Sequence, residues 1–280
     1  MSTRPDNDEG DDTVIERSFV PIRSGVVHVA ACGSGHPVLL LHQTPRSWDE
    51  FRDVLPLLGR RWRAIAMDTV GFGDSTPLPA GQDSIEAWAD AAHQLLAALG
   101  HDTAIVVGHH TGAAIAVEMA AAQPERVAAL VLSASPYVDA ARRAGAAGKK
   151  VVDDVTASAD GRHLMELWAM RRAFYPEGRG DLLERFVIDA LRAGPRAAEG
   201  HRVVGRYVME PRLAVVRCPT LVIAPTADPH AYPHAARVAR DIPGSTLVEI
   251  ENGMVPLPDH MPEQFAAVVD RFLSGLRPAG

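Results

Sequence analysis

Short runs of apolar, mostly β-branched residues alternate along the chain with longer stretches in which apolar residues recur every three or four positions. The short runs are typical of strands buried on both faces, and the longer stretches are typical of amphipathic helices. Strands are expected as an antiparallel pair over 19–31, then at 37–41, 62–67, 103–107, 128–133, 219–224 and 245–250. Helices are expected at 48–58, 85–99, 113–123, 235–240 and 263–276. This alternation predicts an α/β fold, with a mainly parallel eight-stranded sheet flanked by helices.

The alternation stops between about residues 137 and 212, where amphipathic helical patterns continue without a buried strand. We therefore expect one α/β core formed by 14–137 and 213–278, with a helical cap inserted at 138–212. Residues 1–13 are acidic and lack an apolar segment, so they are expected to form a disordered tail.

Bulk composition narrows the classes of partner. The chain has 280 residues, a formal net charge of -7 and no long run of Lys or Arg, which argues against nucleic acid or an anionic membrane. Two cysteines make neither a disulfide framework nor a metal motif. No apolar run approaches the ~18 residues needed to span a bilayer. We expect a cytoplasmic protein with a small-molecule substrate, and a homodimer as one option for its assembly.

The stretch VVGHHTGAAIA, residues 106–116, carries the main chemical signal. A β-branched run enters a glycine, two histidines and a threonine follow, and a second glycine opens an alanine-rich helical pattern. A sharp strand-to-helix turn projects its central side chain above the carboxyl edge of the sheet, where open α/β folds bind ligands. That central residue is His110.

Four segments together resemble the α/β-hydrolase superfamily, and the resemblance covers nearly all of residues 19–277. They are LLLHQTP (39–45), MDTVGFGDS (67–75), GHHTG (108–112) and PTLVIAPTADPH (219–230). GHHTG is similar to the family's nucleophile elbow. The helical insertion is similar to the cap of the haloalkane dehalogenase and epoxide hydrolase branch. The resemblance implies a hydrolase fold in which the last of these segments carries the catalytic acid, here Asp228.

The chain departs from the family pattern at the reacting positions. His110 stands where the family has its nucleophile, and the stretch ENGMVPLP (251–258) holds no histidine where the family has its catalytic base. Gln43 stands where glycine is usual in the first loop, and Thr111 replaces the tryptophan that holds halide in dehalogenases. Dehalogenation is therefore not expected.

These departures leave three roles open for His110. It could act as a general base, as a nucleophile, or as a filler in a site that has lost catalysis. We favour a base that Asp228 orients, because that carboxylate is retained and the usual imidazole is missing. The resemblance places the oxyanion-binding N–H groups at Thr44 and Thr111. The Gln43 side chain either adds an amide donor or fills the space that glycine leaves.

In the cap, Trp168 and Tyr175 are candidates for apolar substrate contact, although aromatic residues at helical spacing more often serve packing. His163 and His201 could reach the substrate or lie in solvent. His109 is expected to point away from the site. The segment 228–234 has Asp and two His, but its prolines spoil a helical chelate, so neither a metal nor another cofactor is expected.

Two functions from different classes follow. The first is an enzyme of the α/β-hydrolase fold that acts on an uncharged, fairly apolar small molecule by hydrolysis or by proton abstraction of the lyase or cyclase type. The second is a catalytically silent sensor or carrier that binds a small molecule on the same fold.

Overall fold

A computed structural model describes residues 13–146, 148 and 151–276. Eight strands form one sheet in the order β1-β2-β4-β3-β5-β6-β7-β8. Their bounds are Glu16–Ile22 (β1), Gly25–Cys32 (β2), Pro37–Leu41 (β3), Arg63–Met67 (β4), Ala104–His109 (β5), Val127–Ser133 (β6), Thr220–Pro225 (β7) and Thr246–Ile250 (β8). β2 pairs antiparallel with β1 and with β4, and every other pair is parallel. The expected fold class is therefore confirmed. Residues 1–12 of the expected tail lie outside the described residues.

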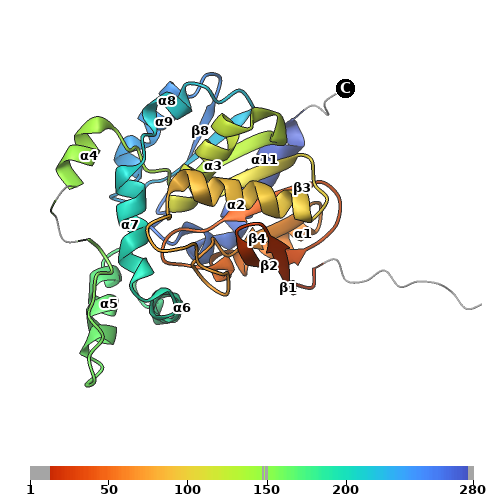
Figure 1. Ribbon diagram of the computed structural model, residues 1–280. Coiled ribbons are helices and arrows are strands. Elements are labelled where there is room, and N and C mark those ends of the chain that lie inside the picture. Colours follow the sequence, from red (N-terminus) through yellow and green to blue (C-terminus); the bar gives the residue numbers. More distant parts are fainter. Residues whose placement is uncertain (1–12, 147, 149–150, 277–280) are drawn as a thin grey trace, which may run out of the picture.

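Alternating side chains of the central strands feed two separate cores, because successive residues of a strand point to opposite faces. In β3, Leu39 and Leu41 pack on one face, and Val38 and Leu40 pack on the other. The first face is covered mainly by helices α2 (Ile85–Ala98), α3 (Thr111–Ala122) and α9 (Tyr232–Asp241). The second is covered by α1 (Leu55–Gly59) and α11 (Pro262–Gly275). Figure 1 shows the layers on the two sides of the sheet.

The helix expected at 48–58 is broken in the structure. A 3₁₀ turn spans Trp48–Phe51, and α1 begins only at Leu55. Pro56 lies in the first turn of α1, where its missing N–H costs nothing. A continuous helix would instead require that N–H to bond the carbonyl four residues earlier, so proline favours a new start.

A helical insertion separates β6 from β7, as the sequence predicts. Its helices are α4 (Ala140–Ala146), α5 (Arg162–Arg172), α6 (Gly180–Ala193), α7 (Arg196–Arg206) and α8 (Glu210–Leu213). The first four lie together at one side of the sheet in Figure 1. The insertion has a small core of its own, in which α5 packs against α6. Leu167, Leu182 and Phe186 are buried there. Part of this insertion supplies walls of the cavity described below.

No helix among the described residues is long and apolar enough to cross a membrane.

Candidate active site

The strand-to-helix turn at His110 is built by the two glycines that flank it. β5 ends at His109, α3 begins at Thr111, and His110 between them has φ 48°. A Cβ added to Gly108 would lie 2.2 Å from the Gly112 carbonyl oxygen, and one added to Gly112 would lie 1.9 Å from the Leu41 carbonyl oxygen. Only glycine fits either position. A left-handed non-glycine residue costs about 1–3 kcal/mol, and such residues cluster at functional sites.

His110 lies against the predicted acid. Its Nε2 is 2.7 Å from Oδ2 of Asp228, whose side chain is fully buried. The two atoms miss the alignment of a straight hydrogen bond, and neither has another hydrogen-bond partner, so the contact is a close electrostatic one. Burial opposes ionisation of Asp228, but the facing imidazole and the backbone N–H groups of His230 and Ala231 together outweigh burial and hold the pKa of that carboxyl well below its usual range. Asp228 is therefore a carboxylate at neutral pH.

Asp228 is itself fixed by backbone donors. Its Oδ1 accepts the N–H groups of His230 at 2.8 Å and Ala231 at 3.0 Å. These two bonds leave Oδ2 for the imidazole and fix the direction from which the carboxylate meets it. A carboxylate beside Nε2 favours the tautomer that carries its proton there, so Nδ1 of His110 is left as a hydrogen-bond acceptor.

Nδ1 of His110 makes no hydrogen bond within the part of the chain that the structure describes, and His110 lines a cavity of about 880 Å³. That volume lies in the range of small-molecule sites. The cavity walls come from the first loop, the elbow, the α9 loop and the helical insertion. Lining residues include Gln43, Thr44, Thr111, Pro136, Met170, Phe174, His201, His230 and Val255.

The predicted oxyanion donors are unequal. The Thr44 N–H donates to the Thr111 hydroxyl at 3.3 Å, so a substrate oxygen would have to compete with that hydroxyl. The Thr111 N–H opens helix α3, where the first N–H groups have no partner within the helix. Helix N-termini also carry a partial positive charge. Thr111 is therefore the stronger of the two donors.

Gln43 lines the cavity, and Glu50 holds its amide group in place. Its backbone N–H donates to Glu50 Oε2 at 2.8 Å, and its side-chain Nε2 donates to Glu50 Oε1. Burial raises the pKa of Glu50 to about 7. These bonds use one of the two N–H groups of the side-chain amide, so both roles expected for Gln43 stay open.

A buried ion network holds the first loop in place. Arg46 is fully buried, and its Nε donates to Asp189 of α6 at 2.9 Å. Its Nη1 bonds Asp259, which lies next to the segment that lacks the catalytic histidine. Ser47 Oγ also donates to Asp189, at 2.8 Å. The first loop, the helical insertion and α10 (Leu257–His260) are thereby tied together around the site.

His109 is structural, as expected from its neighbour's position on the turn. Its Nε2 donates to the Val255 carbonyl at 2.9 Å, and its Nδ1 meets the Ser133 hydroxyl at 3.0 Å. Burial, followed by the nearby His110, puts the pKa of His109 well below its usual value. It is therefore a neutral group that anchors the segment where the family pattern would place its base.

A second imidazole–carboxylate pair reaches the cavity from the cap. His201 lines the cavity, and its Nε2 is 2.8 Å from Oδ2 of Asp153. Arg171 also bonds Asp153, with Nε to Oδ1 at 2.9 Å. No local spacing in the sequence links Asp153 to His201, because the two residues come from different parts of the insertion. Asp153 has a left-handed backbone, with φ 65°. Its sequence neighbours do not predict this conformation, which Asp tolerates better than most residues.

Trp168 and Tyr175 are not brought to the cavity lining. Tyr175 is buried in the small core of the insertion with its ring against Phe186, and Trp168 packs partly buried against the same core and Gly180. Their positions among the described residues favour packing over the expected contact with substrate. Both rings pack in the core between α5 and α6. Packing is the commoner use of aromatic residues in amphipathic helices.

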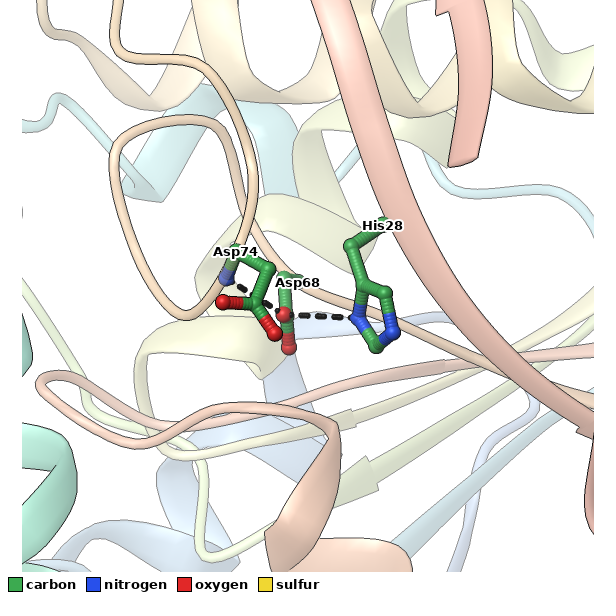
Figure 2. A group of neighbouring side chains, drawn as sticks. All are labelled: His28, Asp68 and Asp74. Atoms are coloured by element: carbon green, nitrogen blue, oxygen red, sulfur yellow. Dashed lines mark hydrogen bonds and ion pairs between the residues drawn. The ribbon is translucent and has the colours of Figure 1, made fainter. Parts of the chain in front are cut away.

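A cluster of potential metal ligands lies elsewhere in the fold, at His28, Asp68 and Asp74 (Figure 2). Each ligand atom is already engaged. His28 Nδ1 is 2.9 Å from Asp68 Oδ2, and Arg17 donates to His28 Nε2 at 2.9 Å and to Asp74 Oδ2 at 2.9 Å. Arg192 of the insertion pairs with the other Asp74 oxygen. The guanidinium groups of Arg17 and Arg192 occupy acceptors that a metal ion would need. We therefore interpret the cluster as a set of ion pairs that connects β2, the loop after β4 and the insertion, and not as a metal site.

Comparison with known proteins agrees with this geometry. Residues 36–253 match the profile described as the alpha/beta hydrolase fold, and the chain belongs to that family. A soluble epoxide hydrolase from Corynebacterium sp. (strain C12) is 39% identical over 90 residues, covering 32% of this chain and 31% of the relative. A 2-hydroxymuconate semialdehyde hydrolase from Pseudomonas sp. (strain CF600) is 37% identical over 109 residues, covering 38% of each. The matched stretches thus span less than two fifths of these relatives.

Solved structures extend the likeness over the whole fold. An esterase from Rhodococcus sp. ECU1013 has a TM-score of 0.78 at 26% identity, and the match covers 94% of this chain and 99% of that one. The epoxide hydrolase CorEH has a TM-score of 0.70 at 18% identity, covering 94% and 100%, which shows the fold alone. The chain thus belongs to the α/β hydrolase fold family and is similar to a soluble epoxide hydrolase, a 2-hydroxymuconate semialdehyde hydrolase and an esterase.

Proposed function

We propose that the protein hydrolyses a small carbonyl substrate with an apolar body, using His110 as general base and Asp228 as the group that orients it. The observation that carries this proposal is the 2.7 Å contact between His110 Nε2 and Asp228 Oδ2, with Nδ1 left free on the cavity wall. A general base needs such an orienting partner, and a filler does not.

The reaction uses the chain's own groups and water. Nδ1 of His110 takes a proton from water, and the hydroxide attacks the carbonyl carbon. The oxygen that becomes negative is bound by the Thr111 N–H, and by Thr44 where the substrate displaces the Thr111 hydroxyl. The imidazolium, held by Asp228, then gives its proton to the leaving group. Base catalysis of this kind contributes about 10²–10⁴-fold in rate.

The geometry favours the base over the nucleophile. The accessible nitrogen is Nδ1, which is bonded to the ring carbon that carries Cβ. A bulky acyl or alkyl group on that nitrogen would crowd the side chain's own Cβ and the tight turn beneath it. A proton has no such requirement. The same base could take a proton from carbon, as lyase or cyclase chemistry needs, but the hydrolase relatives favour water as its partner.

A hydrolysis screen over esters, lactones and β-diketones, with the parent protein and His110→Ala in parallel, tests the proposal. We expect turnover that His110→Ala loses, and only weak turnover of p-nitrophenyl acetate, because no short hydroxyl nucleophile stands at the elbow. Acid-quenched mass spectrometry during turnover should find no adduct on the protein. An acyl adduct on His110 would replace the base by a nucleophile, and equal turnover in His110→Ala would end the proposal.

One observation favours a second candidate, a small-molecule binding protein without catalysis. The Thr44 N–H is already bonded to the Thr111 hydroxyl, so half of the oxyanion site is engaged by the protein itself. In that case a ligand would bind equally to the parent and to His110→Ala, and no member of the screen would turn over.

A further inference from the structure

The charged groups on the cavity wall are all of one sign. Five arginines line it, and no aspartate or glutamate appears among the described lining residues. The arginines are Arg142, Arg143, Arg171, Arg202 and Arg206. The expectation of an uncharged substrate is not supported by this wall, although the apolar part of the expectation is.

Four of these arginines are neutralised by carboxylates that lie behind the wall. The pairs are Arg143 with Glu210 at 2.7 Å, Arg171 with Asp153, Arg202 with Asp154 at 2.7 Å, and Arg206 with Glu199 at 2.8 Å. Their positive charge is therefore already compensated within the protein.

Arg142 differs from the other four. No side chain of the described residues forms a hydrogen bond or an ion pair with its guanidinium; only its backbone N–H is bonded, to Asp139 at 2.8 Å. Arg142 is an exposed residue, yet partial loss of hydration lowers the pKa of its guanidinium, and Asp139 opposes this only in part. Asp139 also serves Arg237 at 2.9 Å. His230 and His234 also lie within electrostatic reach, and neither supplies a negative charge.

We infer that the cavity takes an amphipathic carboxylate, whose anionic end pairs with Arg142. This inference rests on the proposed function, because it names the substrate class of the same site. A guanidinium offers a fork of N–H donors that matches a carboxylate in a bidentate pair. The anion would supply the counter-charge that the described protein does not provide.

The rest of the wall fits the body of such a molecule. Pro136, Val151, Val152, Met170, Phe174 and Val255 give it an apolar lining. Arg142 comes from α4 and His110 from the elbow, so two different elements of the fold would hold the two ends of the substrate. The carboxylate thereby sets the orientation in which the carbonyl meets the base.

Binding of unreactive probes tests the inference without any need for turnover. Isothermal titration at about 50 mM salt, where charge contacts are weakly screened, would compare 5-phenylpentanoate with 5-phenylpentanamide. The proteins are the parent, Arg142→Gln and a matched control, Arg206→Gln, whose arginine lines the same cavity but is paired with Glu199. Thermal melts establish that each variant is folded.

We expect the parent to bind the acid about 10- to 100-fold tighter than the amide, the range of a charged hydrogen-bonded contact. Arg142→Gln should reduce that preference to about twofold or less while leaving amide affinity unchanged, and Arg206→Gln should keep the preference. Equal binding of acid and amide by the parent, or an equal loss of both in Arg142→Gln, would overturn the inference. Tighter binding of 4-phenylbutyl phosphate than of the acid would overturn carboxylate as the class.

The two proposals fail separately. His110→Ala should keep the preference for the acid, because the probes do not need a base. A preserved preference without any turnover in the hydrolysis screen would refute catalysis alone. Turnover of uncharged substrates, together with equal affinity for acid and amide, would refute the carboxylate inference alone.

Discussion

Two imidazole–carboxylate pairs reach the same cavity, one from the core and one from the helical insertion. His110 meets Asp228 at 2.7 Å, and His201 meets Asp153 at 2.8 Å. In both pairs the contact uses Nε2. The pairs differ in what else holds the carboxylate. Asp228 is held by two backbone N–H groups, whereas Asp153 is held by the Arg171 guanidinium.

That difference decides how much of each carboxylate's charge is left to act on its imidazole. The Arg171 charge already compensates Asp153, so His201 gains little from a proton: burial lowers its pKa, Arg171 adds to the lowering, and Asp153 opposes it only in part. Asp228 has no cationic side chain as a partner among the described residues, so its charge remains available to stabilise an imidazolium at His110. The proposed base must hold a proton during the reaction. The core pair offers it a carboxylate without a cationic partner among the described residues, whereas the cap pair does not.

The largest expected effect is on catalysis by the core pair. His110→Ala should lower kcat/KM about 10²–10⁴-fold, the usual contribution of a positioned base. His163→Ala is the control, because that cap histidine bonds the Ser158 N–H and does not line the cavity. Steady-state kinetics on the best substrate of the screen measures both. A comparable loss in His163→Ala would show that the effect is general damage to the cap.

The next effect is on stability and concerns the cap pair. Asp153→Asn leaves Arg171 buried without its counter-charge and should lower the free energy of unfolding by about 3 kcal/mol at neutral pH, as breaking a buried pair does. Asp154→Asn, at an exposed neighbouring pair, should cost about 0.5 kcal/mol or less. Urea denaturation measures both variants. Equal losses would mean that the Asp153 pair acts as an ordinary surface pair.

The pH dependence of that stability difference has a definite sign. The pKa of Asp153 is lowered to about 2 in the folded protein, mainly by Arg171 and His201 acting against burial. Its ionisation therefore stabilises the fold above the ordinary carboxyl pKa, and that stabilisation is lost as the pH falls toward about 2. The gap between parent and Asp153→Asn should be constant from pH ~5 to ~8 and shrink below ~4.

A smaller effect is expected on the additivity of the two core substitutions. Asp228→Asn removes the carboxylate that orients His110 and should lower kcat/KM by a factor similar to that of His110→Ala. Because residues that act as a unit are non-additive, His110→Ala with Asp228→Asn should cost little more activity than His110→Ala alone. Fully additive losses would separate the two residues.

The smallest effect is expected from the cap imidazole. His201→Gln removes one neutral polar group from the cavity wall and should lower kcat/KM about 2- to 10-fold, the range of a single neutral hydrogen bond. A loss in His201→Gln as large as that in His110→Ala would show that the cap pair carries the proton, and would reverse the comparison.

The sequence predicts the part of the site in the α/β core better than the part in the helical insertion. The sequence predicts that His110 and Asp228 lie close together, because each follows a buried parallel strand. The carboxyl ends of such strands meet at one edge of the sheet. The sheet itself follows from alternating apolar patterns. The helical insertion was visible as a region without strands, but its contacts were not, because an amphipathic pattern says which face is apolar and not what the face meets.

Single residues of the insertion show which contacts the sequence does not predict. Trp168 and Tyr175 have the pattern of packing residues and of substrate contacts alike, and only the fold of α5 on α6 decides between them. Asp153 joins His201 across 48 positions, which no local period records. The free guanidinium of Arg142 is equally hidden, because four other cavity arginines look the same in sequence and differ only in having carboxylate partners.

The bond between His109 and the Val255 carbonyl has a consequence for redesign of the elbow. A serine placed at 110 would lie beside the His109 ring, because the rings of residues 109 and 110 are 4.8 Å apart. That imidazole is not available as its base, because both of its nitrogens are already engaged, by Ser133 and Val255. A histidine introduced near Met254 would have to enter a segment whose course depends on the same bond. Conversion of this site into that of a serine hydrolase therefore requires coordinated changes at several positions.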